Sequence, residues 1–242
     1  ISLRVVTNQK KITKNIQHNA RKTRYSLLSQ ECKKRKTKLI LTAHHKDDQI
    51  ETFLIRLSRG SGVQGLSAMN ISSYLEKKIR VFRPFLTISK KELVHASNKI
   101  FGSFIKDPSN KNTKYLRTNI RKLLPLFTKH GIQEDQIIKS INNLKSSSET
   151  INIYFRDIFK KIVKKRNDGY LIEKKDLFSL NEELQLRVLG LVIKSINKSY
   201  YPPRSKKIVN ALKFLSIKQG KKYHLGGCRL LSSSKYINIQ KT

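Results

Sequence analysis

The feature that most limits the fold of this chain is a short apolar run at residues 39–41, which leads through a polar run into a helical pattern. A continuous apolar run of this length is typical of a buried parallel strand. From Ile50 the apolar residues recur at i, i+3, i+4 and i+7, which predicts an amphipathic helix packed on a sheet. The sequence therefore predicts an α/β domain. The polar run would lie at the carboxyl end of the strand, where such sheets bind ligands.

The acids of the first part of the chain gather in this polar run. Of only four acids in the first 75 residues, three lie within five positions (Asp47, Asp48 and Glu51), directly after His44 and His45. Helix capping alone would explain either aspartate, because N–H groups and the positive dipole end favour carboxylates at a helix N-terminus. It explains His44 and Glu51 less well, so we predict a functional site at His44, Asp47, Asp48 and Glu51. Metal binding is a weaker alternative, because adjacent strand side chains point to opposite faces.

Two pairs of arginines are candidate phosphate-binding residues. Arg21 and Arg24 stand three positions apart, and Arg117 and Arg121 stand four apart, so each pair would share one face of a helix. Guanidinium groups can bind phosphate oxygens with two parallel hydrogen bonds. A solvated basic helix is the alternative for the first pair, and structural salt bridges are the alternative for the second.

The segment that follows the predicted helix is a candidate phosphate-binding turn. It consists of Arg59, Gly60, Ser61 and Gly62. Two glycines around a serine allow a tight turn with exposed backbone N–H groups. An ordinary helix end at Gly60 is an equally good interpretation, and both can hold together.

The charge balance favours a polyanionic partner. Lys and Arg number 52 against 16 Asp and Glu, a formal net charge of +36, and this indicates nucleic acid most simply. An AT-rich coding sequence could account for part of the lysine excess. The two cysteines lie far apart and predict neither a disulfide framework nor a metal site, which is typical of a reducing cytoplasm. No signal peptide and no apolar run of membrane-spanning length are visible.

Several further elements can be predicted from local patterns. Residues 3–6 suggest the end of a strand, residues 15–32 a helix and residues 78–82 a strand. Ser89 and Glu92 form a capping box that opens a helix over residues 90–100. Heptad-spaced apolar residues predict a long helix over 135–166, stopped at residues 167–169. We interpret it as a connector between domains, with a homodimeric coiled coil as the alternative.

The last part of the chain predicts a small, mostly helical α+β domain. A strand at residues 170–172 is followed by a helix that Ser179 and Glu182 would cap. A further helix is predicted over residues 205–215, and Gly226 and Gly227 predict a hairpin turn.

The strand–helix segment also resembles a known family. It reads Ala43-His44-His45-x-Asp47-Asp48-Gln49-x-Glu51-Thr52, then Arg56-Leu57-x-Arg59-Gly60-Ser61-Gly62-x-x-Gly65-Leu66. This run resembles the tRNA(Ile)-lysidine synthetases, a family of PP-loop ATP pyrophosphatases. Two further blocks resemble the same family: Asn19-Ala20-Arg21-Lys22-Thr23-Arg24-Tyr25, and Asp107-Pro108-Ser109-Asn110 followed by Arg117-x-Asn119-x-Arg121.

The resemblance implies a fold and an activity. The fold would be an incomplete Rossmann-like parallel sheet over residues 1–130, the connector helix over 131–169 and a small tRNA-binding domain over 170–242. In this family, ATP adenylates the C2 oxygen of the wobble cytidine of an isoleucine tRNA. The ε-amine of free L-lysine then attacks C2 and releases AMP, which forms lysidine. A cytoplasmic tRNA-modifying ligase that uses ATP, with Mg²⁺, is therefore expected.

With that activity, the candidate residues divide into three groups. The acids and His44 would act on lysine, its proton or Mg²⁺, with Arg24 and Arg117 stabilising charge on the activated cytidine. Arg21 and the turn at residues 59–62 would contact the nucleotide phosphates. The tRNA-binding set is Asp107, Asn110, Asn119, Arg121 and Arg204.

One departure from the family pattern leaves the activity open. The family carries a Ser-Gly-Gly-x-Asp-Ser loop that cradles the ATP phosphates, and these 242 residues contain no such segment. We therefore expect a fragment, or half of a split enzyme whose PP-loop part is encoded separately. The rival hypothesis is a tRNA-binding chain without catalysis. A tRNA thiolase is a third, less favoured reading, because Cys32 and Cys228 are not placed for that chemistry.

Overall fold

The structure is a computed structural model that describes residues 3–8, 16–76, 78–103, 116–197 and 202–242. The chain divides into two compact units, Ile1–Ser148 and Glu149–Thr242, each with a hydrophobic core of its own. The boundary between them falls within the long helix α6 (Glu134–Ile162). None of the helices in these ranges combines the length and the apolar character that a membrane crossing requires.

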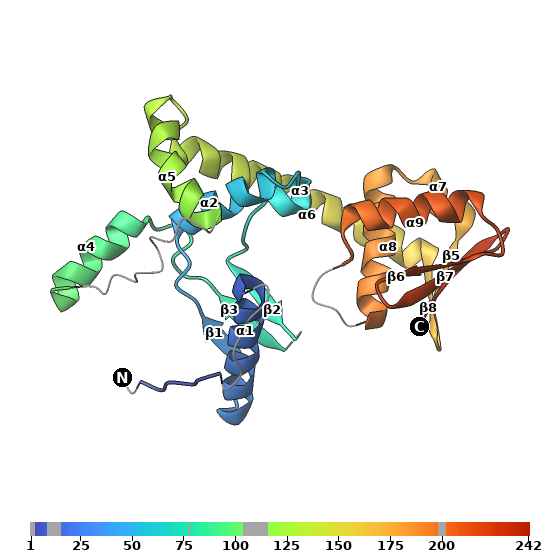
Figure 1. The fold of residues 1–242 in the computed structure, drawn as a ribbon, viewed down its shortest axis with the longest axis horizontal. Helices are drawn as coiled ribbons and strands as arrows, with labels where there is room; N and C mark the ends of the chain where they lie inside the picture. The colour runs from blue at the N-terminus through green and yellow to red at the C-terminus, as the bar shows by residue number, and fades with distance from the viewer. Residues whose placement is uncertain (1–2, 9–15, 77, 104–115, 198–201) are drawn as a thin grey trace. The chain divides into compact units, whose positions relative to one another are not determined.

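The first unit contains a small mixed sheet (Figure 1). Within the described residues it has three strands, β1 (Leu39–Leu41), β2 (Ser72–Leu75) and β3 (Ile79–Phe82), in the order β1-β3-β2. β1 runs parallel to β3, with Ile40 opposite Val81, and β2 runs antiparallel to β3. The parallel pair confirms the predicted α/β class, whereas β2 has no counterpart among the predicted elements.

Helix α1 (Ile16–Lys34) covers one face of this sheet. Ile40 and Val81 point toward the helix and form a small core with Cys32. The predicted strand end at residues 3–6 is wrong. These residues have no regular secondary structure, none of the described strands pairs with them, and the Leu3 side chain is 90% exposed.

The polar run leads into α2 (Lys46–Leu57), as predicted, and a turn then leads to the short helix α3 (Val63–Leu66). The predicted capping box is confirmed at the start of α4 (Lys90–Phe101). There the N–H of Glu92 donates to Ser89 Oγ, and the N–H of Ser89 donates to Glu92 Oε2.

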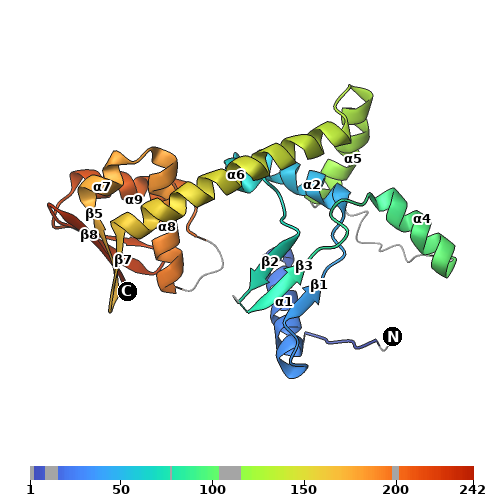
Figure 2. The same cartoon turned by 180° about the vertical axis from the view of Figure 1, so that it is seen from behind.

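Helix α5 (Leu116–Lys129) packs against α2 (Figures 1 and 2). Ile50 of α2 is fully buried and meets Leu124 of α5 together with Ile137 and Ile141 of α6. This apolar contact fixes how the two helices are rotated, and so determines which of their side chains face each other.

The heptad pattern of α6 is confirmed by burial. Ile141, Ser148, Phe155 and Ile162 are all buried, and the first lies in the core of the first unit whereas the last two lie in that of the second. The apolar seam of α6 therefore packs against its own chain at both ends.

The predicted end of the long helix at Arg166 is wrong. Residues 163–166 form strand β4 (Val163–Arg166), which pairs antiparallel with β5 (Gly169–Glu173). The residues predicted to stop the helix instead make the turn of this hairpin. Gly169 is needed there, because a Cβ would lie only 2.0 Å from the carbonyl oxygen of Ile239.

The second unit is an α+β structure built on an antiparallel sheet, which in the described ranges has five strands in the order β4-β5-β8-β7-β6. Its other strands are β6 (Lys222–Leu225), β7 (Cys228–Ser232) and β8 (Tyr236–Lys241). The predicted hairpin is confirmed: Gly226 and Gly227 join β6 to β7 with φ values of 59° and 73°, as a type I′ turn requires.

Helices α7 (Lys174–Ser179), α8 (Glu182–Asn197) and α9 (Ser205–Ile217) pack with the end of α6 on one face of this sheet (Figure 2). The predicted cap at Ser179 is wrong, because that residue ends α7. Asn181 caps α8 instead, with its Oδ1 accepting from the N–H of Leu184 at 3.0 Å.

Candidate active site

The predicted acidic cluster begins at the N-terminus of α2. The backbone N–H of His45, the residue before the helix, donates to Asp48 Oδ2 at 3.0 Å. This is the capping interaction expected of a carboxylate at a helix N-terminus, and it orders the loop between β1 and α2. Capping uses only one oxygen of Asp48, however, so the other oxygen remains to be explained.

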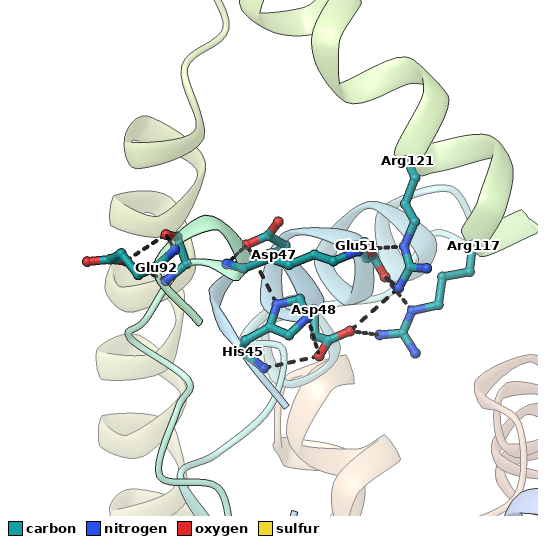
Figure 3. A network of polar contacts seen from close by, with 9 residues as sticks. His45, Asp47, Asp48, Glu51, Glu92, Arg117 and Arg121 are labelled. Atoms are coloured by element: carbon teal, nitrogen blue, oxygen red, sulfur yellow. Dashed lines mark hydrogen bonds and ion pairs between the residues drawn. The ribbon is translucent and has the colours of Figure 1, made fainter. Parts of the chain in front are cut away.

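The other oxygen of Asp48 and both oxygens of Glu51 face helix α5 (Figure 3). Glu51 Oε2 accepts from Arg117 Nε at 2.5 Å, and Glu51 Oε1 accepts from Arg121 Nε at 2.5 Å. Arg117 Nη2 also donates to Asp48 Oδ1 at 3.1 Å. The sequence predicted Arg117 and Arg121 on one helical face, and the structure turns that face toward Asp48 and Glu51.

We call Asp48, Glu51, Arg117 and Arg121 the α2–α5 ion cluster. It balances two carboxylates with two guanidinium groups in a largely water-excluded place: Glu51 is 2% exposed and Asp48 8%. Such a cluster is costly to disrupt from one side, because the partner charge is then left buried without compensation. The arginine side chains keep about a third of their area exposed, at 37% and 31%. They can therefore reach a ligand while the carboxylates hold them.

Asp47 has a different set of partners from Asp48. Its Oδ1 accepts from the backbone N–H of Lys90 at the start of α4 and lies 3.6 Å from His45 Nδ1. The His45 imidazole and the Lys90 N–H together lower the pKa of Asp47 to about 2, and Asp47 in turn raises the pKa of His45. Asp47 thus joins the starts of α2 and α4.

A pocket of about 220 Å³ lies between α1 and the end of β1. Its lining residues are Arg21, Arg24, Tyr25, Leu28, Thr42, Ala43 and His44. The guanidinium of Arg21 lies 5.0 Å from the centre of the Tyr25 ring, which helps to hold it at the rim. The structure therefore places the predicted Arg21, Arg24 and His44 around a single cavity.

His44 lines this pocket, and the next residue, His45, donates its N–H to Asp48 of the ion cluster. The Nδ1 atom of His44 is 2.9 Å from Thr42 Oγ1. Burial lowers its pKa, the nearby Asp48 carboxylate opposes that shift, and Arg83, Arg21 and Arg117 reinforce it. The imidazole is therefore neutral near pH 7 and can accept a proton.

The predicted phosphate-binding turn has its backbone donors occupied in part. The N–H groups of Gly60 and Ser61 donate to the carbonyls of Leu57 and Arg56, which closes the end of α2. Gly60 has φ 65°, the left-handed conformation expected at a helix end. A phosphate role for Arg59–Gly62 stays a prediction, with the exposed Arg59 side chain as its most accessible group.

Two further predicted residues, Asn119 and Arg204, are not among those that line the pocket. Asn119 is exposed on α5, and Arg204 is exposed at the start of α9 in the second unit. Asp107 and Asn110 lie outside the described residues, so the structure does not test them.

Three residues that face the site were not predicted. Thr42 and Tyr25 line the pocket, and Arg83 is buried after β3, where its Nη1 donates to the carbonyl of Asn70 at 2.9 Å. Arg83 Nε is buried and has no hydrogen-bond partner within the described residues. The alternation of β1 could have indicated Thr42, because it lies two residues before His44 on the same side of the chain.

A magnesium ion does not fit the carboxylates of this site as they stand. All four oxygens of Asp48 and Glu51 accept hydrogen bonds from the chain itself. Across the ranges that the structure describes, no group of three His, Cys, Asp or Glu is arranged to hold a metal.

Comparisons with known proteins give the site a family context. A family model described as a PP-loop domain matches residues 1–127. The tRNA(Ile)-lysidine synthase of Wolbachia pipientis wMel is 37% identical over 227 residues, which are 93% of this chain and 52% of that protein. That of Orientia tsutsugamushi (strain Boryong) is 31% identical over 245 residues, 96% of this chain and 54% of that protein. The chain thus spans about half the length of the curated relatives it matches.

Proposed function

Because the chain belongs to the PP-loop family and is homologous to tRNA(Ile)-lysidine synthases, we propose that it serves the ATP-dependent ligation of lysine to the wobble cytidine of an isoleucine tRNA. The C2 oxygen of the cytidine attacks the α-phosphorus of ATP, and diphosphate leaves. The ε-amine of lysine then attacks C2, the bond from C2 to the AMP oxygen breaks, and the amine gives up a proton.

One observation carries this proposal: a pocket with two arginines and a neutral histidine, His44, is joined through the next residue, His45, to a cluster with two more arginines. Both steps pass through states in which negative charge builds up on phosphate and leaving oxygens. Guanidinium groups that are held in place stabilise such charge without reorganising during the reaction. In the proposal, Arg21 and Arg24 contact the phosphates at the pocket, and Arg117 faces the activated cytidine.

His44 is the proton acceptor in this scheme. If its Nδ1–H donates to Thr42 Oγ1, its Nε2 carries a lone pair directed away from Thr42. A neutral imidazole with that tautomer can take the proton from the attacking amine. The lowered pKa of His44 keeps it in the accepting form near pH 7.

Asp48 and Glu51 act on the reaction through the arginines. Their oxygens are engaged by Arg117, Arg121 and the His45 N–H, so we assign them the positioning of the guanidinium groups rather than proton transfer. This role explains why the acids need to be paired on one helix face and buried. A direct contact with the lysine ammonium would require an arginine to release a carboxylate first.

The test is an assay of purified chain with ATP, L-lysine and an unmodified isoleucine tRNA transcript. The proposal expects AMP that depends on both lysine and tRNA, and lysidine in the nuclease digest of the tRNA by mass spectrometry. The Arg24→Gln and His44→Gln variants should lose product while retaining tRNA binding. Product that is unchanged in both variants would remove the pocket from the mechanism.

A second candidate is a tRNA-binding chain without turnover, which the formal net charge of +36 supports; these 242 residues contain no Ser-Gly-Gly-x-Asp-Ser segment. It predicts tight tRNA binding with steep salt dependence and no AMP under any condition. A split enzyme predicts instead that a separate polypeptide carrying that loop restores AMP formation when added. The same assay, run with and without such a polypeptide, distinguishes these outcomes.

A further inference from the structure

Arg83 is a buried cation at the carboxyl end of strand β3. The residue is 6% exposed, and its backbone N–H donates to the carbonyl of Ile71. Its Nη1 donates to the carbonyl of Asn70 at 2.9 Å and to Ser73 Oγ at 3.1 Å. Its Nε is buried and meets no acceptor among the residues that the structure describes. Both side-chain partners of this guanidinium are therefore neutral.

The lack of a counter-charge separates Arg83 from the arginines of α5. Arg117 and Arg121 each contact a buried carboxylate, whereas no Asp or Glu in the described ranges forms an ion pair with Arg83. Burying a charge without an opposite charge is unfavourable, and a guanidinium does not avoid this cost by giving up its proton. Hydrogen bonds to a carbonyl and a hydroxyl need only a neutral donor. The positive charge itself therefore requires an explanation.

The sheet places Arg83 beside the end of β1. Strands β1 and β3 are parallel with Leu41 opposite Phe82, so their carboxyl ends lie at the same edge of the sheet. The N–H of Thr42 donates to the carbonyl of Phe82 at 3.0 Å, which extends the ladder by one residue and brings Thr42 level with Arg83. His44 follows Thr42 by two positions, and its Nδ1 lies 2.9 Å from Thr42 Oγ1.

Arg83 lies on the α1 side of this sheet. By strand alternation it follows Ile79 and Val81, which are buried in the small core beneath α1. Tyr25 and Leu28 of α1 pack on the same core and also line the pocket. The guanidinium therefore belongs to the layer beneath the pocket, although Arg83 is not among the residues that line it.

His44 is the pocket residue on which this charge acts. The charged and titratable groups around it come from four segments of the first unit: Asp48 of α2, Arg83 after β3, Arg21, Arg24 and Tyr25 of α1, and Arg117 of α5. Burial lowers the pKa of His44 most, Asp48 opposes this shift, and Arg83 contributes more to the lowering than the other arginines. Arg83 is also far less exposed than Arg21 or Arg117, so water and salt screen its charge least.

We propose that Arg83 is a positioning residue of the proposed reaction, a fixed positive charge beneath the pocket that acts on His44 without contacting substrate. The proposal rests on the proposed function for the role of His44 as the proton acceptor. A proton on this imidazole would add a second positive charge beside a cation that has no counter-charge of its own. Arg83 therefore favours the neutral, accepting form of His44, while the proposed hydrogen bond to Thr42 selects the tautomer.

The alternative is a purely structural role, in which Arg83 only ties the end of β3 to the segment at residues 70–73. The two roles need different properties of the side chain. A tie depends on the hydrogen bonds of the guanidinium, whereas an action on His44 depends on its charge. Ser73 makes the distinction testable, because its Oγ contacts the guanidinium directly.

The experiment measures the pKa of His44 in the full chain by imidazole NMR, with His44→Gln to assign the signal, and the pH–rate profile of lysidine formation. Arg83→Gln removes the charge and keeps an amide donor for the carbonyl of Asn70. Ser73→Ala keeps the charge and removes one hydrogen bond. Arg80→Gln is the matched control, because Arg80 carries the same charge on the same strand but is exposed on the opposite face. Circular dichroism with thermal unfolding shows which variants fold.

Ser73→Asp provides the same test without removing the arginine. A carboxylate at this position pairs with the guanidinium, so the buried cation gains the counter-charge that it lacks and its effect on the pocket is offset. The variant should unfold at a higher temperature than Ser73→Ala. It keeps the proposal testable even if Arg83→Gln does not fold.

In Arg83→Gln and in Ser73→Asp the pKa of His44 should rise by about one pH unit, as expected for a nearby unit charge that the protein screens in part. The acidic limb of the pH–rate profile should move upward with it, so that the rate near pH 6 falls about threefold and the rate near pH 8.5 changes little. Ser73→Ala and Arg80→Gln should leave the pKa of His44 within about 0.2 pH unit of its wild-type value. An unchanged pKa in folded Arg83→Gln or Ser73→Asp would overturn the assignment, and so would an equal rise in Ser73→Ala.

These outcomes are separable from failure of the proposed function. The NMR titration uses no ATP, lysine or tRNA. A pKa of His44 that responds to Arg83 in a chain that forms no lysidine contradicts only the catalytic proposal. A chain that forms lysidine while His44 keeps its pKa in Arg83→Gln contradicts only the role of Arg83.

Discussion

Glu51 on α2 and Arg121 on α5 are 70 positions apart in sequence, and their Oε1 and Nε atoms lie 2.5 Å apart. Glu51 is almost fully buried, so its carboxylate is compensated by this guanidinium and by that of Arg117 rather than by water. The contact ties the helix that follows the first strand to a helix far along the chain. Its energetics are therefore a test of how the candidate site is held together.

Removing one charge of this contact should destabilise the first unit strongly. We expect Glu51→Gln to lower the free energy of unfolding by about 3 kcal/mol, because two arginines then lose their buried counter-charge. Urea unfolding of the full chain, followed by circular dichroism, measures the change. Asp157→Asn on the exposed side of α6 is the control and should cost less than about 0.5 kcal/mol.

A double-mutant cycle isolates the pair itself. In Glu51→Gln with Arg121→Gln, the second substitution should cost much less than it does alone, since no buried carboxylate remains for it to satisfy. The expected coupling is about 2 kcal/mol. Strictly additive effects would contradict a direct interaction between the two side chains.

The pKa values of the two adjacent histidines should be shifted in opposite directions from the ordinary value of 6.5. Burial and nearby arginines lower the pKa of His44, whereas Asp47 raises that of His45. Imidazole NMR signals, assigned with His44→Gln and His45→Gln, measure both. We expect His45 to remain protonated at a pH where His44 is already neutral, and a reversed order would contradict the described environments.

The linked stability effects have opposite signs. His44 binds a proton less well in the folded state than in the unfolded state. The free energy of unfolding therefore falls as the pH drops below 6.5 and through the folded-state pKa of His44. His45 stabilises the fold below 6.5, and that stability is lost as pH rises through its folded pKa. Asp47→Asn should remove the His45 effect, because the imidazole loses its largest stabilising partner. An unchanged His45 pKa in that variant would disprove the pairing.

The stabilisation that Asp47 provides should be lost in acid. Its pKa of about 2 lies below the ordinary 3.8, so its stabilisation is complete above 3.8 and is lost as pH falls toward 2. Acid unfolding of wild type and Asp47→Asn should therefore converge at low pH. The expected difference at neutral pH is about 1 kcal/mol after allowance for solvent screening.

Local chemistry made much of this fold predictable. A few neighbouring residues are enough to determine several elements. Examples are the apolar run at β1, the periodicity of α2 and the two glycines between β6 and β7. Ser89 and Glu92 are equally local, and their capping box is confirmed. By contrast, Ser179 and Asn181 both precede α8, and only the packing of α7 decides which of them caps it.

The contents of the site were predictable only as a set of residue types. The sequence indicated clustered acids and paired arginines; it assigned the acids to lysine and the arginines to phosphate, with structural salt bridges as the alternative for Arg117 and Arg121. That the acids hold the arginines follows from the packing of Leu124 against Ile50, a contact between segments far apart in sequence. Strand β2 was not predicted for a related reason. Its four residues, Ser72–Leu75, are few and partly polar, so they show no strand pattern of their own, and the strand forms by pairing with β3.

The hydroxyl of Thr42 provides the last test, because it acts on the proposed reaction only through His44. Thr42→Val keeps the shape of the side chain and removes the oxygen that lies 2.9 Å from His44 Nδ1. Without it the proposed Nδ1–H loses its acceptor, so the tautomer with the proton on Nε2, which cannot accept one there, becomes more populated. We expect lysidine formation to fall about tenfold, in the range that general base catalysis supplies, with Kd for tRNA unchanged.

The pH–rate profile should shift as well, which a merely structural role would not produce. Thr42→Ser, which retains the hydroxyl, should restore most of the rate, and a serine variant as slow as the valine variant would refute the role of this hydrogen bond.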